Sequence, residues 1–175
     1  MKTYLLSEMA DWIKTLHAGE EILLSGTVYT ARDAAHKRLC ALLDEHKPLP
    51  FPLAGSAIYY AGPTPAKNGL PIGSCGPTTS SRMDPYLPRL FDVGLRLTIG
   101  QGDRSPAVYE AIKRYGGAYL LALGGAGALV AQSVRTLDVI AFPELGCESV
   151  KRLVIEKLPL YVGIDAPGAS IFSKH

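Results

Sequence analysis

Three segments combine small residues with polar or basic side chains in a way that suits binding of an anion. The first, residues 30–38 (TARDAAHKR), lies where a strand is expected to pass into a helix. Helical spacing places Arg32 four residues and Asp33 three residues before His36, so one helix face could present all three. The alternative is an ordinary first helical turn, with Asp33 near the positive end of the dipole and basic residues facing solvent. Spacing alone favours this structural alternative.

The second segment, residues 76–82 (GPTTSSR), places four consecutive hydroxyl side chains beside Arg82. Hydroxyls and backbone N–H groups donate to anions, and the planar arginine fork matches a carboxylate. Thr78 or Ser80 could also move a proton, which for an alcohol requires strong activation. An equally weighted alternative is a polar surface turn that leads to a helix cap at Asp84.

Two further segments are rich in glycine. Residues 99–104 (IGQGDR) follow an expected strand, where glycines would let a ligand approach the backbone, or simply form a tight turn. Residues 119–130 (YLLALGGAGALV) resemble the strand, turn and helix of a dinucleotide site. The fingerprint requires glycine where Val130 stands, and Glu144 is only a rough match for its acidic residue. We therefore interpret the glycines of residues 119–130 as turn residues.

Alternating strands and helices must position these segments. Apolar, β-branched runs favour strands, helical periodicity favours helices, and Ser-Pro and Asp-Pro pairs mark helix starts. Strands are expected at residues 21–30, 57–61, 95–99, 118–123, 137–142, 151–158 and 160–165, and helices at 7–16, 31–46, 84–91, 106–115 and from 128. This order predicts one α/β domain over residues 1–175, with parallel and antiparallel pairings.

Composition excludes several classes of protein. The 175 residues fit one domain, and 47% hydrophobic against 19% charged residues supports a buried core. A net charge of +2 is too balanced to indicate nucleic acid or an anionic membrane as partner. No apolar run approaches the ~20 residues of a membrane span, and the first residues lack signal-peptide features. We expect a soluble, cytoplasmic protein.

The cysteines and histidines do not indicate a metal site. Cys40, Cys75 and Cys147 are far apart in the sequence, and no pair forms a C-x-x-C motif. Four histidines show no zinc-finger spacing. The odd number of cysteines favours reduced thiols over a disulfide framework, so we predict no metal ligand in this chain.

Six motifs, taken together in their order along the chain, point to a known family. They are RDAAHKR, YYAGPTPAKNG, SCGPTTSSRMD, IGQGDRS, GGAGALVA and ELGCESVKRL. The chain resembles the β subunit, or C-terminal domain, of the iron–sulfur hydro-lyases, the class I fumarases and L(+)-tartrate dehydratases. The resemblance covers roughly residues 18–172, and GPTTSSRM following RD-x-x-H is its most specific part. It implies a swivelling β/β/α domain similar to the mobile domain of aconitase.

The resemblance also implies a partner. The active site would lie between this chain and an α subunit, in an assembly of two α and two β subunits (α2β2). The α subunit would bind a [4Fe–4S] cluster through three cysteines, and its open iron would act as a Lewis acid on the substrate's hydroxyl and carboxylate. This chain would bind no cofactor and would be inactive alone.

Residue roles follow from the same resemblance. Arg32 and Arg82 would bind substrate carboxylates, which suits a C4 dicarboxylate because two arginines offset two charges and fix its orientation. Thr78 would exchange the proton on C3, while Ser80 and Thr79 would contact the substrate.

Two further positions carry open questions. His36 and Asp33 fall on the family's R-D-x-x-H pattern, where His36 either transfers a proton or orients Arg32 and Asp33. Gln101 stands where the family usually has a lysine that reaches the substrate. Either Arg104 or a partner residue compensates for the missing charge, or the substrate differs from fumarate, or the change is simply tolerated.

The leading interpretation is the β subunit of a fumarate hydratase, which interconverts fumarate and L-malate. Its nearest rival is an L(+)-tartrate dehydratase β subunit, which forms oxaloacetate. A stand-alone anion- or nucleotide-binding module and a non-catalytic interaction subunit, the latter suggested by Gln101, are the alternatives from other classes.

Overall fold

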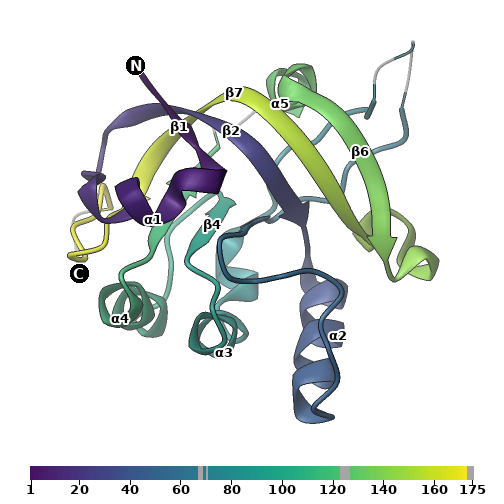
Figure 1. The fold of residues 1–175 in the computed structure, drawn as a ribbon, viewed down its shortest axis with the longest axis horizontal. Coiled ribbons are helices and arrows are strands. Elements are labelled where there is room, and N and C mark those ends of the chain that lie inside the picture. Colours follow the sequence, from purple (N-terminus) through teal and green to yellow (C-terminus); the bar gives the residue numbers. More distant parts are fainter. Residues whose placement is uncertain (67–68, 70, 123–126, 173–175) are drawn as a thin grey trace.

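The computed structural model describes residues 1–66, 69, 71–122 and 127–172, and a sheet of seven strands runs through it (Figure 1). The strand order is β1-β2-β3-β4-β5-β7-β6, and β2 also pairs with β7. Strands β2, β3, β4, β5 and β7 therefore form a closed ring, to which β1 and β6 are added. The strands are β1 (Lys2–Leu5), β2 (Glu21–Thr30), β3 (Ala57–Tyr59), β4 (Leu97–Gly100), β5 (Ala118–Leu121), β6 (Val134–Ala141) and β7 (Val150–Ile164).

Both kinds of strand pairing occur. Strands β1 to β5 pair in parallel with their neighbours, whereas β7 is antiparallel to β2, β5 and β6. The carboxyl ends of β2 to β5 thus meet at one edge, where ligands of parallel sheets usually bind. The predicted α/β class with mixed pairing is confirmed.

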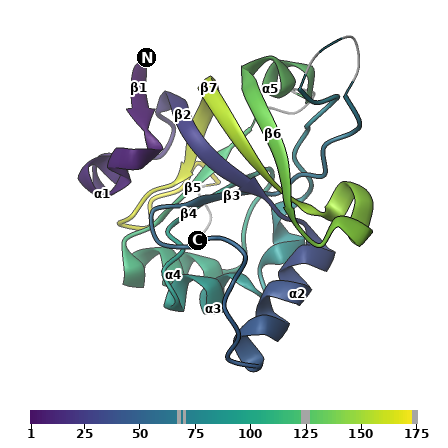
Figure 2. The same ribbon diagram turned by 45° about the vertical axis from the view of Figure 1, so that its right-hand side comes forward.

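Helices cover the sheet on two sides. In Figures 1 and 2, α2 (Asp33–Asp44), α3 (Leu87–Asp92) and α4 (Pro106–Tyr115) lie together below the sheet, and α1 (Met9–Trp12) and α5 (Gly127–Ser133) lie apart from them. Short 3-10 helices are η1 (Leu6–Glu8), η2 (Ile13–Thr15), η3 (Ser80–Met83) and η4 (Pro143–Glu148). No described helix is long and apolar enough to cross a membrane.

Alternation along the strands divides the apolar residues between two cores. On β3, Ala57 and Tyr59 belong to the core shared with α1 and α5, whereas Ile58 packs with α2, α3 and α4. Strands β3, β4 and β5 are buried on both faces, which explains their nearly continuous apolar sequences, whereas β7 alternates between buried and exposed residues over much of its length.

The helix expected at residues 84–91 begins later than predicted. Asp84 does not cap it, because its carboxylate accepts hydrogen bonds from Arg104 and from the backbone N–H of Ser105. The residues just before Asp84 form η3 (Ser80–Met83), and α3 begins only at Leu87, with Pro88 in its first turn. A buried tertiary ion pair thus took the place of the local cap.

Two expected C-terminal strands are one strand. β7 continues through Pro159 because β2 and β5 supply partners beyond this residue. Near the junction Lys157 adopts a left-handed conformation (φ 51°), and its N–H donates to Ser25 Oγ at 2.9 Å. That side-chain bond keeps the strand connected where the ladder is interrupted.

The amino-terminal prediction was partly wrong. The expected helix at 7–16 is a single α-helical turn flanked by η1 and η2, and β1 before it was not predicted. Trp12 Nε1 donates to the Leu5 carbonyl at 2.8 Å, so this segment is fixed by tertiary contacts rather than by helix length.

Candidate active site

The carboxyl ends of β2, β3 and β4 bring the predicted segments together. Arg32 follows β2, Gly62 follows β3 and Gln101 follows β4. The segment with the hydroxyl side chains is tied to the same edge, since Pro77 bridges to Ala61 and the N–H of Thr78 donates to the Tyr60 carbonyl at 2.7 Å.

An ion pair joins the first two segments. Arg82 Nε donates to Asp33 Oδ2 at 3.0 Å, with the two side chains 53% and 35% exposed. An exposed pair of this kind contributes only about 0–1 kcal/mol to stability. Its consequence is geometric: the bond fixes Arg82 Nε against Asp33 Oδ2, and no hydrogen bond to another described residue engages the terminal nitrogens of Arg82.

Arg32 is held close to the backbone. A Cβ on Gly62 would lie 3.2 Å from Arg32 Cδ and 2.9 Å from the Cys147 carbonyl oxygen, so only glycine leaves room here. Arg32 Nε and Asp33 Oδ1 are buried, and neither has a hydrogen-bond partner within the described part of the chain. Unsatisfied buried polar atoms are costly, which makes this pair of residues a candidate for ligand contact.

His36 is buried one turn into α2. Its Nδ1 lies 2.8 Å from the Arg32 carbonyl, and because a carbonyl only accepts, Nδ1 carries the proton and donates. Burial lowers the pKa of His36 to about 4, so the ring is neutral near pH 7. The neutral ring packs against Tyr60 and Tyr86 and fixes the backbone of Arg32.

Ser80 faces the interior and is fully buried. Its Oγ accepts from the N–H of Gln101 at 3.0 Å and lies 2.7 Å from the Tyr119 hydroxyl. The single hydroxyl proton of Tyr119 is donated to the Gly102 carbonyl at 2.7 Å. The Ser80 hydroxyl is therefore the donor in its bond with Tyr119. These bonds join the hydroxyl segment to the β4 loop.

Arg104 is the centre of a buried network. Its Nε donates to Asp84 at 2.6 Å, its terminal nitrogens donate to Thr98 and Tyr60, and its guanidinium lies over the rings of Tyr60 and Tyr119. With a side chain 0% exposed and its charge already paired, Arg104 does not supply the charge that Gln101 lacks. The expectation that Arg104 compensates is therefore wrong.

Thr78, Thr79 and Gln101 occupy the outer part of this edge. Thr79 is exposed and bridges to Gln101, whereas Thr78 and Gln101 are half-buried. Among the described residues, no side-chain hydrogen bond engages the Thr78 hydroxyl. The same is true of the Thr79 hydroxyl among these residues, so Thr78 and Thr79, unlike the buried Ser80, have hydroxyl groups that could meet a reactant.

The candidate site also contains a segment to which sequence reasoning gave no role. η4 lies against the start of α2, where Glu148 accepts from the N–H of Ala34 at 3.2 Å and Glu144 pairs with Arg38 at 2.8 Å. Lys151, just beyond it, is 6% exposed and donates to two η4 carbonyls. The ELGCESVKRL motif was the available signal for this contact.

The cysteines of this chain do not fit an iron–sulfur cluster. Cys75 is buried, with its pKa raised to about 12 by burial, whereas Cys147 is exposed and Cys40 is half-buried on α2. Across the part of the chain that is described, no three His, Cys, Asp or Glu side chains converge in a way that could hold a metal ion. We therefore assign no reaction step to a metal ion or cluster held by this chain.

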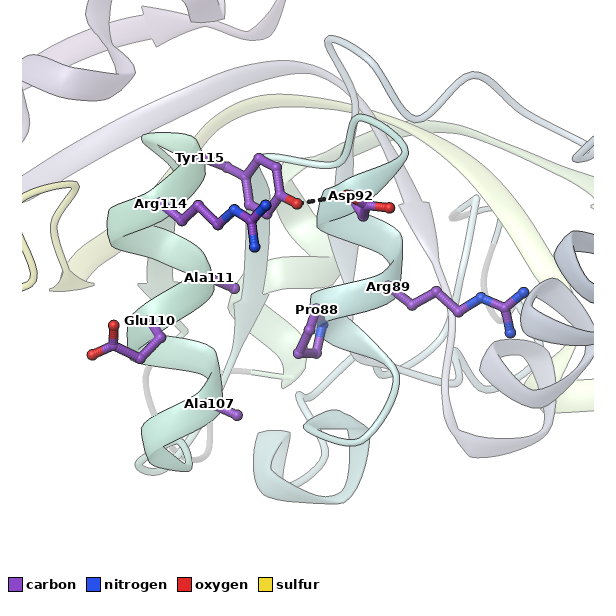
Figure 3. Close-up of a pocket in the computed structure, with 8 residues that line it drawn as sticks. All are labelled: Pro88, Arg89, Asp92, Ala107, Glu110, Ala111, Arg114 and Tyr115. Atoms are coloured by element: carbon purple, nitrogen blue, oxygen red, sulfur yellow. Dashed lines mark hydrogen bonds between the residues drawn. The ribbon is translucent and has the colours of Figure 1, made fainter.

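A separate groove of about 590 Å³ lies between α3 and α4. Figure 3 shows small side chains along it, the Tyr115 hydroxyl bonded to Asp92, and Arg89 and Glu110 extending away to opposite sides. None of the predicted site residues lines it; the lining is Pro88, Arg89, Asp92, Ala107, Glu110, Ala111, Arg114 and Tyr115. The nucleotide candidate, in turn, depends on residues 123–126, which lie outside the described residues.

Comparison with known proteins identifies the family. The family model for the Fumarase C-terminus matches residues 2–175. The chain belongs to this family. It is 39% identical over 171 residues to fumarate hydratase class I, anaerobic, of Escherichia coli (strain K12), covering 97% of this chain and 31% of that protein. Fumarate hydratase 2 of Leishmania major is 40% identical over 159 residues, or 89% of this chain and 28% of that protein.

A second kind of relative has a similar length. The L(+)-tartrate dehydratase subunit beta of Escherichia coli (strain K12) is 32% identical over 171 residues, or 95% of this chain and 84% of that subunit. The chain thus spans less than a third of the fumarate hydratases named above, but most of a tartrate dehydratase β subunit. The hydro-lyase resemblance deduced from the motifs is confirmed.

Proposed function

We propose that this chain is the β component of a fumarate hydratase and works only with an α subunit, in an α2β2 assembly in the cytoplasm. The observation that carries the proposal is the Arg82–Asp33 ion pair. It joins the two most specific family motifs beside Arg32, whose buried Nε has no hydrogen-bond partner among the residues that the structure describes. Two arginines at one sheet edge suit a C4 dicarboxylate.

The proposal assigns the arginines to the two carboxylates. The terminal nitrogens of Arg82 and the guanidinium of Arg32 would each take one carboxylate, which fixes the C2–C3 bond relative to the loop. Asp33 orients Arg82 through Nε, and the neutral His36 ring holds the backbone of Arg32. Under this proposal His36 positions the site rather than moving the proton.

Thr78 is assigned the proton transfer. In hydration its hydroxyl gives a proton to C3 while a water molecule adds to C2 from the partner's side and releases one proton to solvent. Thr78 then recovers a proton from solvent, so that one water molecule is added overall. Hydroxyl groups need activation for this step, and two neighbouring guanidinium groups stabilise a transient alkoxide. Thr79 and Gln101 would contact the substrate beside Thr78, while Ser80, being buried, would hold Gln101 in place.

The [4Fe–4S] cluster is assigned to the α subunit. This chain's three cysteines differ in exposure, and among the described residues they are not part of any group that could hold a metal ion, which supports placing the cluster ligands elsewhere. Anaerobic co-expression with an α-type chain, followed by assay with fumarate, L-malate and both tartrates, tests the proposal. Turnover of fumarate only when both chains are present is the expected result.

A tartrate dehydratase is the second candidate. The observation that favours it is the 32% identity to the E. coli tartrate dehydratase β subunit over 95% of this chain. Turnover of L(+)-tartrate alone in the same assay would decide for this candidate. Absence of turnover and of a complex would contradict both.

A further inference from the structure

Lys151 is a buried cation whose position needs an explanation. Its residue is 6% exposed, and burial lowers the pKa of its ammonium group. None of the ion pairs found among the described residues involves Lys151. A charge buried without a counter-ion is unfavourable, and an apolar side chain would pack here at lower cost.

The partners of Lys151 are backbone carbonyls. Its Nζ donates to the Gly146 oxygen at 3.0 Å and to the Cys147 oxygen at 2.8 Å. Gly146 has the backbone angles φ 62°, ψ −121°, so η4 turns sharply at this point. The ammonium group thus gathers two carbonyls that the turn directs to the same side.

The Cys147 carbonyl connects Lys151 with Arg32. A Cβ on Gly62 would lie 2.9 Å from the Cys147 oxygen and 3.4 Å from a terminal nitrogen of Arg32. The Arg32 side chain, the Gly62 backbone and the Cys147 carbonyl are therefore packed together, and Lys151 holds the far side of this contact. Glu148, the residue after Cys147, accepts a hydrogen bond from the N–H of Ala34 and so holds η4 at the start of α2.

We propose that Lys151 is a positioning residue for substrate binding: by holding η4 against Gly62, it orients the Arg32 guanidinium toward the dicarboxylate. Its unpaired charge also makes this edge more positive, which partly compensates for the neutral Gln101. This inference rests on the proposed function, because Arg32 must bind a carboxylate for the orientation to matter.

The test uses the assembled complex and succinate, a C4 dicarboxylate without a double bond to hydrate. Lys151→Met removes the charge and both hydrogen bonds while keeping an unbranched side chain. We expect the inhibition constant for succinate and the KM for fumarate to rise about tenfold, with kcat within about twofold of wild type. Lys151→Arg keeps charge and donors and should recover most of the affinity.

A double-mutant cycle separates positioning from general structure. If Lys151 acts through Arg32, adding Lys151→Met to Arg32→Gln weakens succinate binding little further, because the coupled group is already gone. Lys113→Met, on the exposed face of α4, is the matched control and should leave succinate binding unchanged. Lys151→Gln replaces Lys151→Met if that variant fails to assemble.

The outcomes distinguish the two proposals. Unchanged succinate affinity in assembled Lys151→Met or Lys151→Gln complexes, or additive losses in the cycle, would overturn the role of Lys151 while wild-type turnover still supports the proposed function. A wild-type complex that neither hydrates fumarate nor dehydrates tartrate, and does not bind succinate, would overturn both.

Discussion

The Ser80 hydroxyl occupies the space that a side chain on Gly100 would need. A Cβ built on Gly100 would overlap Ser80 Oγ and lie 2.8 Å from Tyr60 Cδ2. Ser80 is also bonded to Gln101 and Tyr119, so the end of β4 and the hydroxyl segment fit together only without that side chain.

Gly100→Ala should therefore displace the segment that carries Thr78. Overpacking of a buried contact costs about 1–3 kcal/mol, which would appear as a lower urea midpoint of unfolding together with reduced turnover. Gly76→Ala is the control, because its Cβ would meet only ordinary contacts, with the nearest atom at 3.8 Å. Equal midpoints for the two variants would contradict this packing argument.

Thr78→Ala should abolish most turnover without affecting assembly. Loss of a positioned proton donor typically lowers a rate about 10²–10⁴-fold, so kcat of the complex should fall by at least about a hundredfold. Ser81→Ala, an exposed hydroxyl three positions away, is the control and should retain activity. Undiminished kcat in Thr78→Ala would instead favour a non-catalytic interaction subunit.

The buried His36 should make stability depend on pH. Its folded pKa of about 4 lies below the ordinary value of 6.5, so folding favours the neutral ring. Its contribution is complete above pH 6.5 and is lost as the pH falls toward 4, which amounts to about 2 kcal/mol between pH 7 and pH 5. Urea unfolding of His36→Asn should lack this component, whereas the exposed-residue variant His17→Asn should keep it.

Arg82 should contribute more to substrate binding through its planar fork than through charge alone. We expect a higher KM for Arg82→Ala than for Arg82→Lys, and Lys should recover only part of the affinity because it cannot bond Asp33 and a carboxylate in the same geometry. Arg114→Ala, in the groove between α3 and α4, is the surface control. Equal KM values for Arg82→Ala and Arg82→Lys would mean that the positive charge at position 82 does not contribute to substrate binding.

Elements that are set by local sequence signals were predicted well, whereas elements that are set by contacts between distant residues were not. β2 was predicted to the residue, and α4 was predicted from its Ser-Pro start and Gly116, because periodicity and end residues are local signals. Asp84 failed as a cap because its partner, Arg104, lies twenty residues away and becomes adjacent only in the fold. The two C-terminal strands could not be joined from sequence, since the pairing with β2 overrides Pro159.

The site was predictable to a similar extent. Motif spacing selected Arg32, Asp33, His36 and the hydroxyl segment, and the structure brings them together at one edge. Burial was not predictable: nothing in GPTTSSR distinguishes the inward Ser80 from the outward Thr79. Lys151 was missed because its contacts are with backbone carbonyls, which leave no mark on residue spacing.

Gln101→Lys should strengthen binding of fumarate to the complex. The backbone of Gln101 is fixed by Ser80 in both directions, since Ser80 Oγ accepts its N–H and its carbonyl accepts the N–H of Ser80. A lysine at this fixed position would add one positive charge beside Arg32 and Arg82. We expect the KM for fumarate to fall about threefold to tenfold at low ionic strength, with less change at high salt because exposed charges are screened.

The control for this variant is Gln101→Met, which has a similar length and no charge. It should leave KM equal to or above the wild-type value, because it loses the amide donor. A rise in KM for Gln101→Lys, with fumarate turnover intact in the wild type, would mean that the site is adapted to a neutral residue here. In that case the preferred substrate would have a hydroxyl or other uncharged polar group facing position 101, and L(+)-tartrate, with a hydroxyl on each central carbon, would become the first compound to compare.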